Sequence, residues 1–160
     1  MSGDDYVYTL PITPVRVKDG VERANNAAAA LPASLPYQPL EWSPITMYVD
    51  PKSLTTAALF GNDVAVRAVH PRERGTELPK YGPGAVLALV TWTQRDDPHW
   101  FGARIPNQPV SVEFVEMGAS TQESRYRRFD GANLAEAAWP SSAATQRTNF
   151  ILGLPPVRLP

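Results

Sequence analysis

The sequence contains no cysteine in its 160 residues. This absence excludes disulfides, thiolate metal sites, a cysteine nucleophile and a haem attached through thioether bonds. Histidine is also scarce, with two in the chain. An axial nitrogen ligand for haem iron would therefore have to come from His70 or His99.

The sequence also lacks an excess of charge of either sign. Its net charge is −1, from 15 basic and 16 acidic residues, so it has no field to attract nucleic acid or an anionic membrane. The arginines at 125, 127 and 128 alternate along a predicted strand, which favours a solvated face over a nucleic-acid patch. No run of 18 apolar residues is present, so no membrane span is predicted. The first five residues are polar and acidic, unlike a signal peptide.

Proline, by contrast, is abundant, at 17 residues, or about twice the average share. This predicts long ordered loops of fixed φ and limited helix. Residues 6–18 alternate and contain prolines, so we expect an extended arm there. An alanine-rich stretch, Val21 to Leu31, is compatible with a helix that Pro32 ends. We therefore expect an N-terminal arm over 1–40 and a single folded domain over 41–160.

The pattern of the second part predicts an α+β domain: an antiparallel sheet of about five strands with two or three packed helices. Ala85–Thr93 is apolar on both faces, which predicts a central strand. The segment 94–109 has three prolines and two aromatics, and we expect an ordered loop there. Asn62 or Asp63 can cap the first helix. The other predicted strands are 45–49, 54–60, 110–117 and 124–129, and the predicted helices are 64–69, 132–138 and 145–152.

The two histidines allow more than one interpretation. His99 follows Asp96 and Asp97, and either aspartate could orient its ring as second-sphere carboxylates do; the alternative is a loop histidine paired with an aspartate. His70 precedes Pro71 at the end of a predicted helix, where a charged imidazole also suits the helix dipole. A metal site built from Asp96, Asp97 and His99 is a third alternative, although their spacing matches no known template.

Carboxylates and aromatics supply the other candidate site residues. Glu113 and Glu116 lie three residues apart on a strand, so they face opposite sides. If Phe114 faces the core, Glu116 shares that side, and burial would make it a candidate acid or base. A solvated carboxylate at the strand end is the alternative. Four aromatics could line a pocket for a small ligand or form an ordinary core: Trp92, Trp100, Phe101 and Phe114.

Several segments taken in order resemble the cytochrome P-460 superfamily, which includes the cytochromes c′-beta. The first is Phe60-Gly61-Asn62-Asp63-Val64-Ala65, a strand end followed by an alanine-rich helix. Tyr81-Gly82-Pro83-Gly84-Ala85-Val86 follows, leading into a strand that reaches Trp92. Val112-Glu113-Phe114-Val115 and Tyr126-Arg127-Arg128-Phe129-Asp130-Gly131 complete the series. The resemblance covers roughly residues 40–138, and the order and spacing of the motifs carry it.

This resemblance implies a strongly bent antiparallel sheet with helices, usually in a homodimer that holds haem c. Members act on hydroxylamine or bind nitric oxide. The family's Cys-x-x-Cys-His motif is missing here, because residues 141–160 contain neither cysteine nor histidine. The lysine that cross-links haem in hydroxylamine-oxidising members also has no counterpart in Leu87–Thr91.

The resemblance therefore implies a periplasmic or lipid-anchored bacterial envelope protein without covalent haem. We expect a non-enzymatic domain that binds a small ligand or has a structural or interaction role. The alternative is a protein with non-covalent haem, ligated by His99 or His70, that acts on or senses nitrogen oxides.

Overall fold

The computed structural model describes residues 27–69, 78–120 and 123–157. The predicted arm at 6–18 and His70 lie outside the described residues. Only the end of the predicted helix at 21–31 is described, as the short 3-10 turn η3 (Ala27–Ala29).

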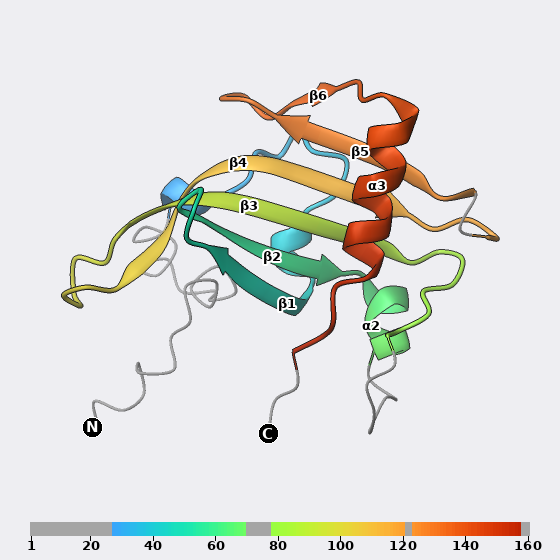
Figure 1. Ribbon diagram of the computed structural model, residues 1–160, viewed down its shortest axis with the longest axis horizontal. Helices are drawn as coiled ribbons and strands as arrows, with labels where there is room; N and C mark the ends of the chain where they lie inside the picture. Colours follow the sequence, from blue (N-terminus) through green and yellow to red (C-terminus); the bar gives the residue numbers. More distant parts are fainter. Residues whose placement is uncertain (1–26, 70–77, 121–122, 158–160) are drawn as a thin grey trace.

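The sheet is an antiparallel meander in which each strand pairs with the next one along the chain. This confirms the α+β class and the antiparallel sheet, but the strand number is six instead of about five (Figure 1). β3 lies inside the sheet between β2 and β4, as its two apolar faces predicted. The strands are β1 (Ser43–Asp50), β2 (Thr55–Gly61), β3 (Val86–Asp96), β4 (Arg104–Glu116), β5 (Arg125–Asp130) and β6 (Ala135–Ala137).

The sixth strand replaces a predicted helix, so the prediction of a helix at 132–138 was wrong. A turn at Gly131, with φ of 81°, and at Leu134, with φ of 49°, reverses the chain. The Leu134 N–H closes this turn by donating to the Gly131 carbonyl at 3.1 Å. Since positive φ values are incompatible with a right-handed helix, the alanines that follow pair with β5 instead.

The segment 94–109 is mostly strand, so the prediction of a loop over this whole range was also wrong. β3 continues to Asp96 and β4 begins at Arg104, which leaves only residues 97–103 as the hairpin tip. The pairing register shifts on both sides of Trp92, which lies opposite Pro109. Proline cannot donate a hydrogen bond to the ladder, so strands tolerate it at such irregularities, where the regular pairing is interrupted.

Two α-helices are found among the described residues, and both were predicted. For α2 (Asp63–Val69), the Asn62 side chain is the cap, since its Oδ1 accepts the Ala65 N–H at 3.0 Å. The same side chain ties the helix to the sheet, because Oδ1 also accepts the Val86 N–H at 3.1 Å. Close packing follows from Gly61, where a Cβ would lie 2.8 Å from the Cβ of Ala65. The second helix, α3 (Ser141–Leu152), begins earlier than the predicted Thr145.

The sheet separates two hydrophobic clusters, one on each face. α3 lies across the front of the sheet, and the segment with η3 and η4 (Pro39–Glu41) passes behind it (Figure 1). The rear cluster includes Ala29 and Leu35, so the described end of the predicted arm packs as part of the core. It centres on Phe60, Trp92, Val112, Phe114 and Phe129. The front cluster is built from Leu59, Leu87, Leu89, Val115 and Ile151, with α2 and α3 packed against the sheet.

Candidate functional site

A buried carboxylate lies on β4, on the face that α3 covers. Phe114 points into the rear cluster with no exposed surface, and its neighbour Glu113 therefore faces the front, where it is 1% exposed. Glu116 shares the face of Phe114, as expected, but it is only partly buried and accepts a hydrogen bond from the Tyr37 hydroxyl at 2.7 Å. The buried carboxylate is thus Glu113 and not Glu116, because both faces of β4 are covered while Glu116 lies at the strand end.

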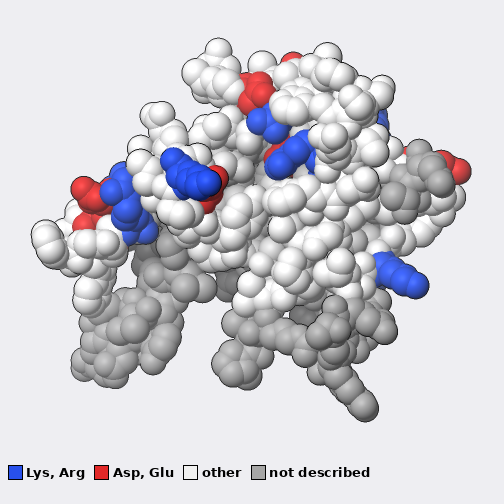
Figure 2. Space-filling view, in the orientation of Figure 1, with Lys and Arg blue, Asp and Glu red and all other residues white. Residues whose placement is uncertain are grey.

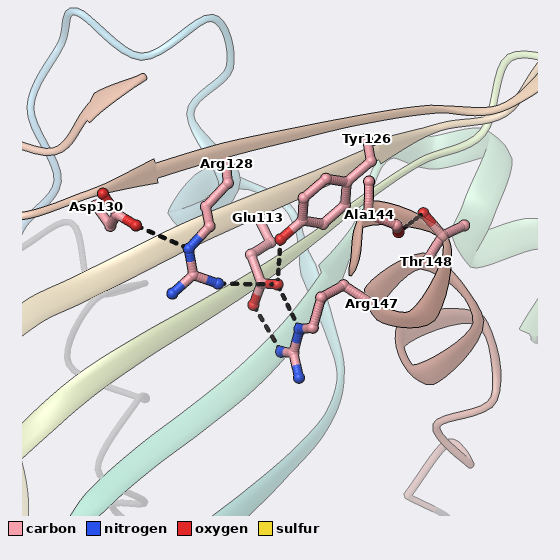
Figure 3. Close-up of polar contacts among 7 residues, drawn as sticks. All are labelled: Glu113, Tyr126, Arg128, Asp130, Ala144, Arg147 and Thr148. Carbon is pink, nitrogen blue, oxygen red and sulfur yellow. Dashed lines mark hydrogen bonds and ion pairs between the residues drawn. The ribbon is translucent and has the colours of Figure 1, made fainter. Parts of the chain in front are cut away.

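Three side chains converge on Glu113 (Figure 3). Arg147 on α3 forms a bidentate contact with it, in which Nε donates to Oε1 at 2.7 Å and Nη2 donates to Oε2 at 2.8 Å. The Tyr126 hydroxyl donates to Oε1 at 2.6 Å, and Arg128 Nη1 lies 3.2 Å from the same oxygen. We call Glu113, Tyr126, Arg128 and Arg147 the Glu113 cluster.

The strand register explains how β5 contributes to this cluster. Arg128 lies directly opposite Glu113 in the β4–β5 ladder, and Tyr126 lies diagonally opposite, beside Val115. Because side chains alternate along a strand, both project to the α3 face. Asp130 comes from the same face of β5 and accepts a hydrogen bond from Arg128 Nε at 2.9 Å. Arg128 is therefore held by two carboxylates.

The environment fixes the protonation of the donors. Burial, and then the hydrogen bond to Glu113, raises the pKa of Tyr126 from 10.0 to about 12, so its hydroxyl stays a donor at neutral pH. The hydrogen bonds to Glu113 raise the pKa of Arg147 further above its usual value. For Arg128, burial opposes the charge, but the bonds to Asp130 and Tyr126 outweigh it and the pKa is raised. Both arginines are permanent cations.

One aromatic ring packs against each of the two arginines, and both rings are partly exposed. The Arg128 guanidinium carbon lies 4.4 Å from the Trp139 ring centroid, and that of Arg147 lies 4.7 Å from the Phe150 ring centroid. The arginine side chains remain 18% and 31% exposed, respectively. Figure 2 shows basic and acidic atoms together near the centre of this face, surrounded by uncharged residues. Such oriented guanidinium groups can bind an anionic group.

The predicted haem and metal residues lie elsewhere or outside the described residues. His99 is exposed at the tip of the β3–β4 hairpin, and its backbone N–H donates to Asp97 Oδ1 at 2.8 Å. That aspartate therefore shapes the turn. Asp96 forms an exposed ion pair with Arg104 at 3.2 Å. In residues 27–69, 78–120 and 123–157, no group of three or more histidine, aspartate or glutamate side chains is placed to hold a metal ion.

The four predicted pocket residues are not brought together. Trp92 and Phe114 belong to the rear cluster, and Trp92 donates its Nε1–H to the Ala29 carbonyl at 2.9 Å. Trp100 is 50% exposed and Phe101 is fully exposed at 108%. The extended β3–β4 ladder carries these two residues to the hairpin tip, which is why they do not join the other two. Trp92 and Phe114 form an ordinary core.

Sequence reasoning missed Tyr126, Arg128 and Arg147 as members of one site. Only part of this site had a local signal. Glu113 lies between two apolar residues, Val112 and Phe114, in a strand that is covered on both faces. Tyr126 and Arg128 are two residues apart on the next strand and therefore share a face. The arginines of β5 were interpreted as a solvated face. Arg128 contradicts this interpretation, because Glu113, Asp130 and Trp139 surround it.

Comparison with known proteins adds no identity. No protein-family model matches the chain, and no curated protein matches it. Within the described part of the chain, no helix has both the length and the apolar character needed to span a membrane.

Proposed function

We propose that this chain is a non-enzymatic binding domain of the P-460-like type, without covalent haem, that takes a small ligand at the Glu113 cluster. One observation carries the proposal. Arg128 and Arg147 are held from behind by buried or partly buried carboxylates, yet part of each side chain reaches the surface.

The energetics of buried ion pairs support a binding role. Moving charges out of water costs several kcal/mol per ion, so an ion cluster is a poor way to attach a helix compared with apolar side chains of similar volume. α3 already packs Ile151 into the front cluster with no exposed surface. Side chains that are fixed before a ligand arrives lose little conformational entropy on binding. A pre-oriented arginine pair therefore favours recognition.

The same contacts favour binding over catalysis. Both oxygens of Glu113 already accept hydrogen bonds, from Arg147 and Tyr126. A general base needs an oxygen within reach of the substrate's proton. Glu113 is instead placed to orient the two arginines, and Tyr126 is occupied as its donor. The envelope location and the homodimer that the resemblance implies are further parts of the proposal, and light scattering on the purified chain tests the dimer.

Thermal unfolding in the presence of a small-molecule panel tests the proposal. We expect at least one anionic, neutral or cationic compound to raise the Tm of the wild-type chain, by mass action on the folded state. Arg128→Gln should abolish that rise. Arg104→Gln is the matched control, because it removes an exposed arginine–aspartate pair on the hairpin.

Two results would count against the proposal. The first is a panel in which no compound raises the Tm in an Arg128-dependent way. The second is a sharp Soret band on adding one equivalent of hemin that is lost in His99→Ala or His70→Ala, which would favour the non-covalent haem alternative.

A further inference from the structure

We infer that the ligand of the Glu113 cluster is a small monocarboxylate with an aromatic or otherwise apolar body. This inference rests on the proposed function and names its ligand class. Its carboxylate would bind the outer edges of Arg128 and Arg147, and its body would lie against Trp139 and Phe150.

Besides their hydrogen bonds to tyrosines, Arg147 to Tyr48 and Arg128 to Tyr126, the two arginines keep donors that their carboxylate partners do not use. Arg147 uses Nε and Nη2 on Glu113, and Arg128 uses Nε on Asp130 and Nη1 on Glu113. A guanidinium group has five N–H donors, and the Nη1 group of Arg147 and the Nη2 group of Arg128 are not used by these carboxylates. Figure 3 shows both nitrogens pointing away from Glu113. Because Arg147 Nε and Arg128 Nη1 both contact Oε1 of Glu113, the two guanidinium groups are neighbours.

The charge balance favours a monoanion over a dianion. Two arginines face two carboxylates in and beside the cluster, Glu113 and Asp130, so the formal charges already cancel. A dianion such as phosphate would place two further negative charges beside them. A monocarboxylate adds one, and its planar shape matches the fork of a guanidinium group.

The surroundings favour an apolar body on that ligand. Trp139 is 38% exposed and Phe150 is 42% exposed, and each stacks on one of the two arginines. A ligand whose carboxylate reaches both guanidinium groups therefore meets exposed aromatic surface next to them. Covering apolar surface adds binding energy roughly in proportion to the area removed from water.

Isothermal titration calorimetry on the full chain with four probes tests the inference. The probes are benzoate, acetate, inorganic phosphate and benzamide, which keeps the benzoate ring but carries no charge. We expect saturable binding of benzoate, about tenfold weaker binding of acetate and of phosphate, and no binding of benzamide over the same concentrations. Arg128→Gln should weaken benzoate at least tenfold, whereas Arg104→Gln should leave it unchanged.

Each other outcome has a distinct meaning. Equal binding of benzamide and benzoate overturns the carboxylate inference but leaves a ligand site at the cluster. Equal binding of phosphate also overturns it, since the site would then respond to charge alone. If no probe binds and no other compound stabilises the chain, the proposed function falls too.

A second variant covers the case in which Arg128→Gln does not fold. Trp139→Leu keeps the side chains of the Glu113 cluster and removes one aromatic surface. The advantage of benzoate over acetate should then fall several-fold while acetate binding stays the same. An unchanged advantage would contradict the role of the aromatic surface.

Discussion

The two faces of the sheet are covered by different parts of the chain and by different chemistry. Behind the sheet, aromatic and aliphatic side chains pack under the segment with η3 and η4, and the Trp92 indole finds its partner in the Ala29 carbonyl. In front, apolar contacts surround an ion cluster that links β4, β5 and α3. Two adjacent residues of β4 lie at the centres of these two groups: Phe114 in the rear cluster and Glu113 in the ion cluster. The difference suggests that the rear face provides stability, while the front face gives up some stability to keep charged groups oriented at the surface.

Truncating the centre of the rear face should have the largest effect. Phe114→Ala removes a fully buried ring that packs against Phe129 and Tyr37. We expect the free energy of unfolding to fall by about 3–5 kcal/mol, from lost transfer energy and the cavity left behind. Urea unfolding followed by tryptophan fluorescence measures it. A loss below about 1 kcal/mol would show that this face is not the main source of stability.

Removing the charge at the centre of the front face should reduce the free energy of unfolding by less, because the arginine side chains can reorient into solvent. For Glu113→Gln we expect a loss of about 2–3 kcal/mol, since two partly buried cations lose their shared carboxylate. The double variant Glu113→Leu with Arg147→Met should come back to within about 1 kcal/mol of the wild type, because apolar side chains of similar size fill the space. Urea unfolding of all three proteins decides the point. If the double variant is as unstable as Glu113→Gln, the cluster is a stabilising link for α3 and the contrast between the faces fails.

A smaller, pH-dependent effect should come from Tyr126. Tyr126→Phe removes one hydrogen bond to a charged group, which we expect to cost about 1.5 kcal/mol at pH 8. The folded state raises the pKa of Tyr126 from 10.0 to about 12. Its contribution is therefore complete below pH 10 and is lost as the pH rises towards 12. Urea unfolding between pH 8 and 11.5 should show a shallower decline in the variant than in the wild type. Parallel curves would contradict the raised pKa.

Tyr37 and Tyr48 set the background for that measurement. Burial is the main cause that raises the pKa of each, and Tyr37 also donates to Glu116. We therefore expect the Tyr126→Phe protein to keep part of the decline above pH 10.

The smallest effect should come from the hairpin tip, which belongs to neither face. Phe101 is fully exposed, so Phe101→Ser should change the free energy of unfolding by no more than about 0.5 kcal/mol. Melting temperature and urea unfolding both report it. A loss above about 1 kcal/mol would mean that this ring packs against the protein in solution.

Much of the fold could be predicted because the signals are local. The apolar residues on both faces of 85–93 marked an inner strand, and Asn62 or Asp63 marked the start of α2. β6 escaped prediction, since alanine alone does not distinguish a helix from an edge strand and the deciding turn uses a positive φ at a leucine. The prolines of 94–109 suggested a loop, although bulges let two strands continue through them.

The candidate site was harder to predict because it depends on how α3 crosses the sheet. Arg147 lies 34 residues from Glu113 in the chain, and no periodic pattern links the two. Alternation along the strand did predict that Glu113 and Phe114 lie on opposite faces of the sheet. Glu113 is a buried carboxylate, however, only because α3 lies over its face. His99 and the aromatics of the tip attracted attention by residue type, whereas the structure leaves them exposed or half-exposed at the end of a hairpin.

The central claim is that Arg128 and Arg147 are held ready for a ligand, and nitrogen-15 NMR of arginine side chains tests it most directly. In a benzoate titration, we predict that the Nε–H signals of Arg128 and Arg147 shift and saturate with the affinity found by calorimetry, while the Arg104 signal stays in place. If the two signals do not move, or move no more than that of Arg104, the cluster is not a binding site and the account is wrong.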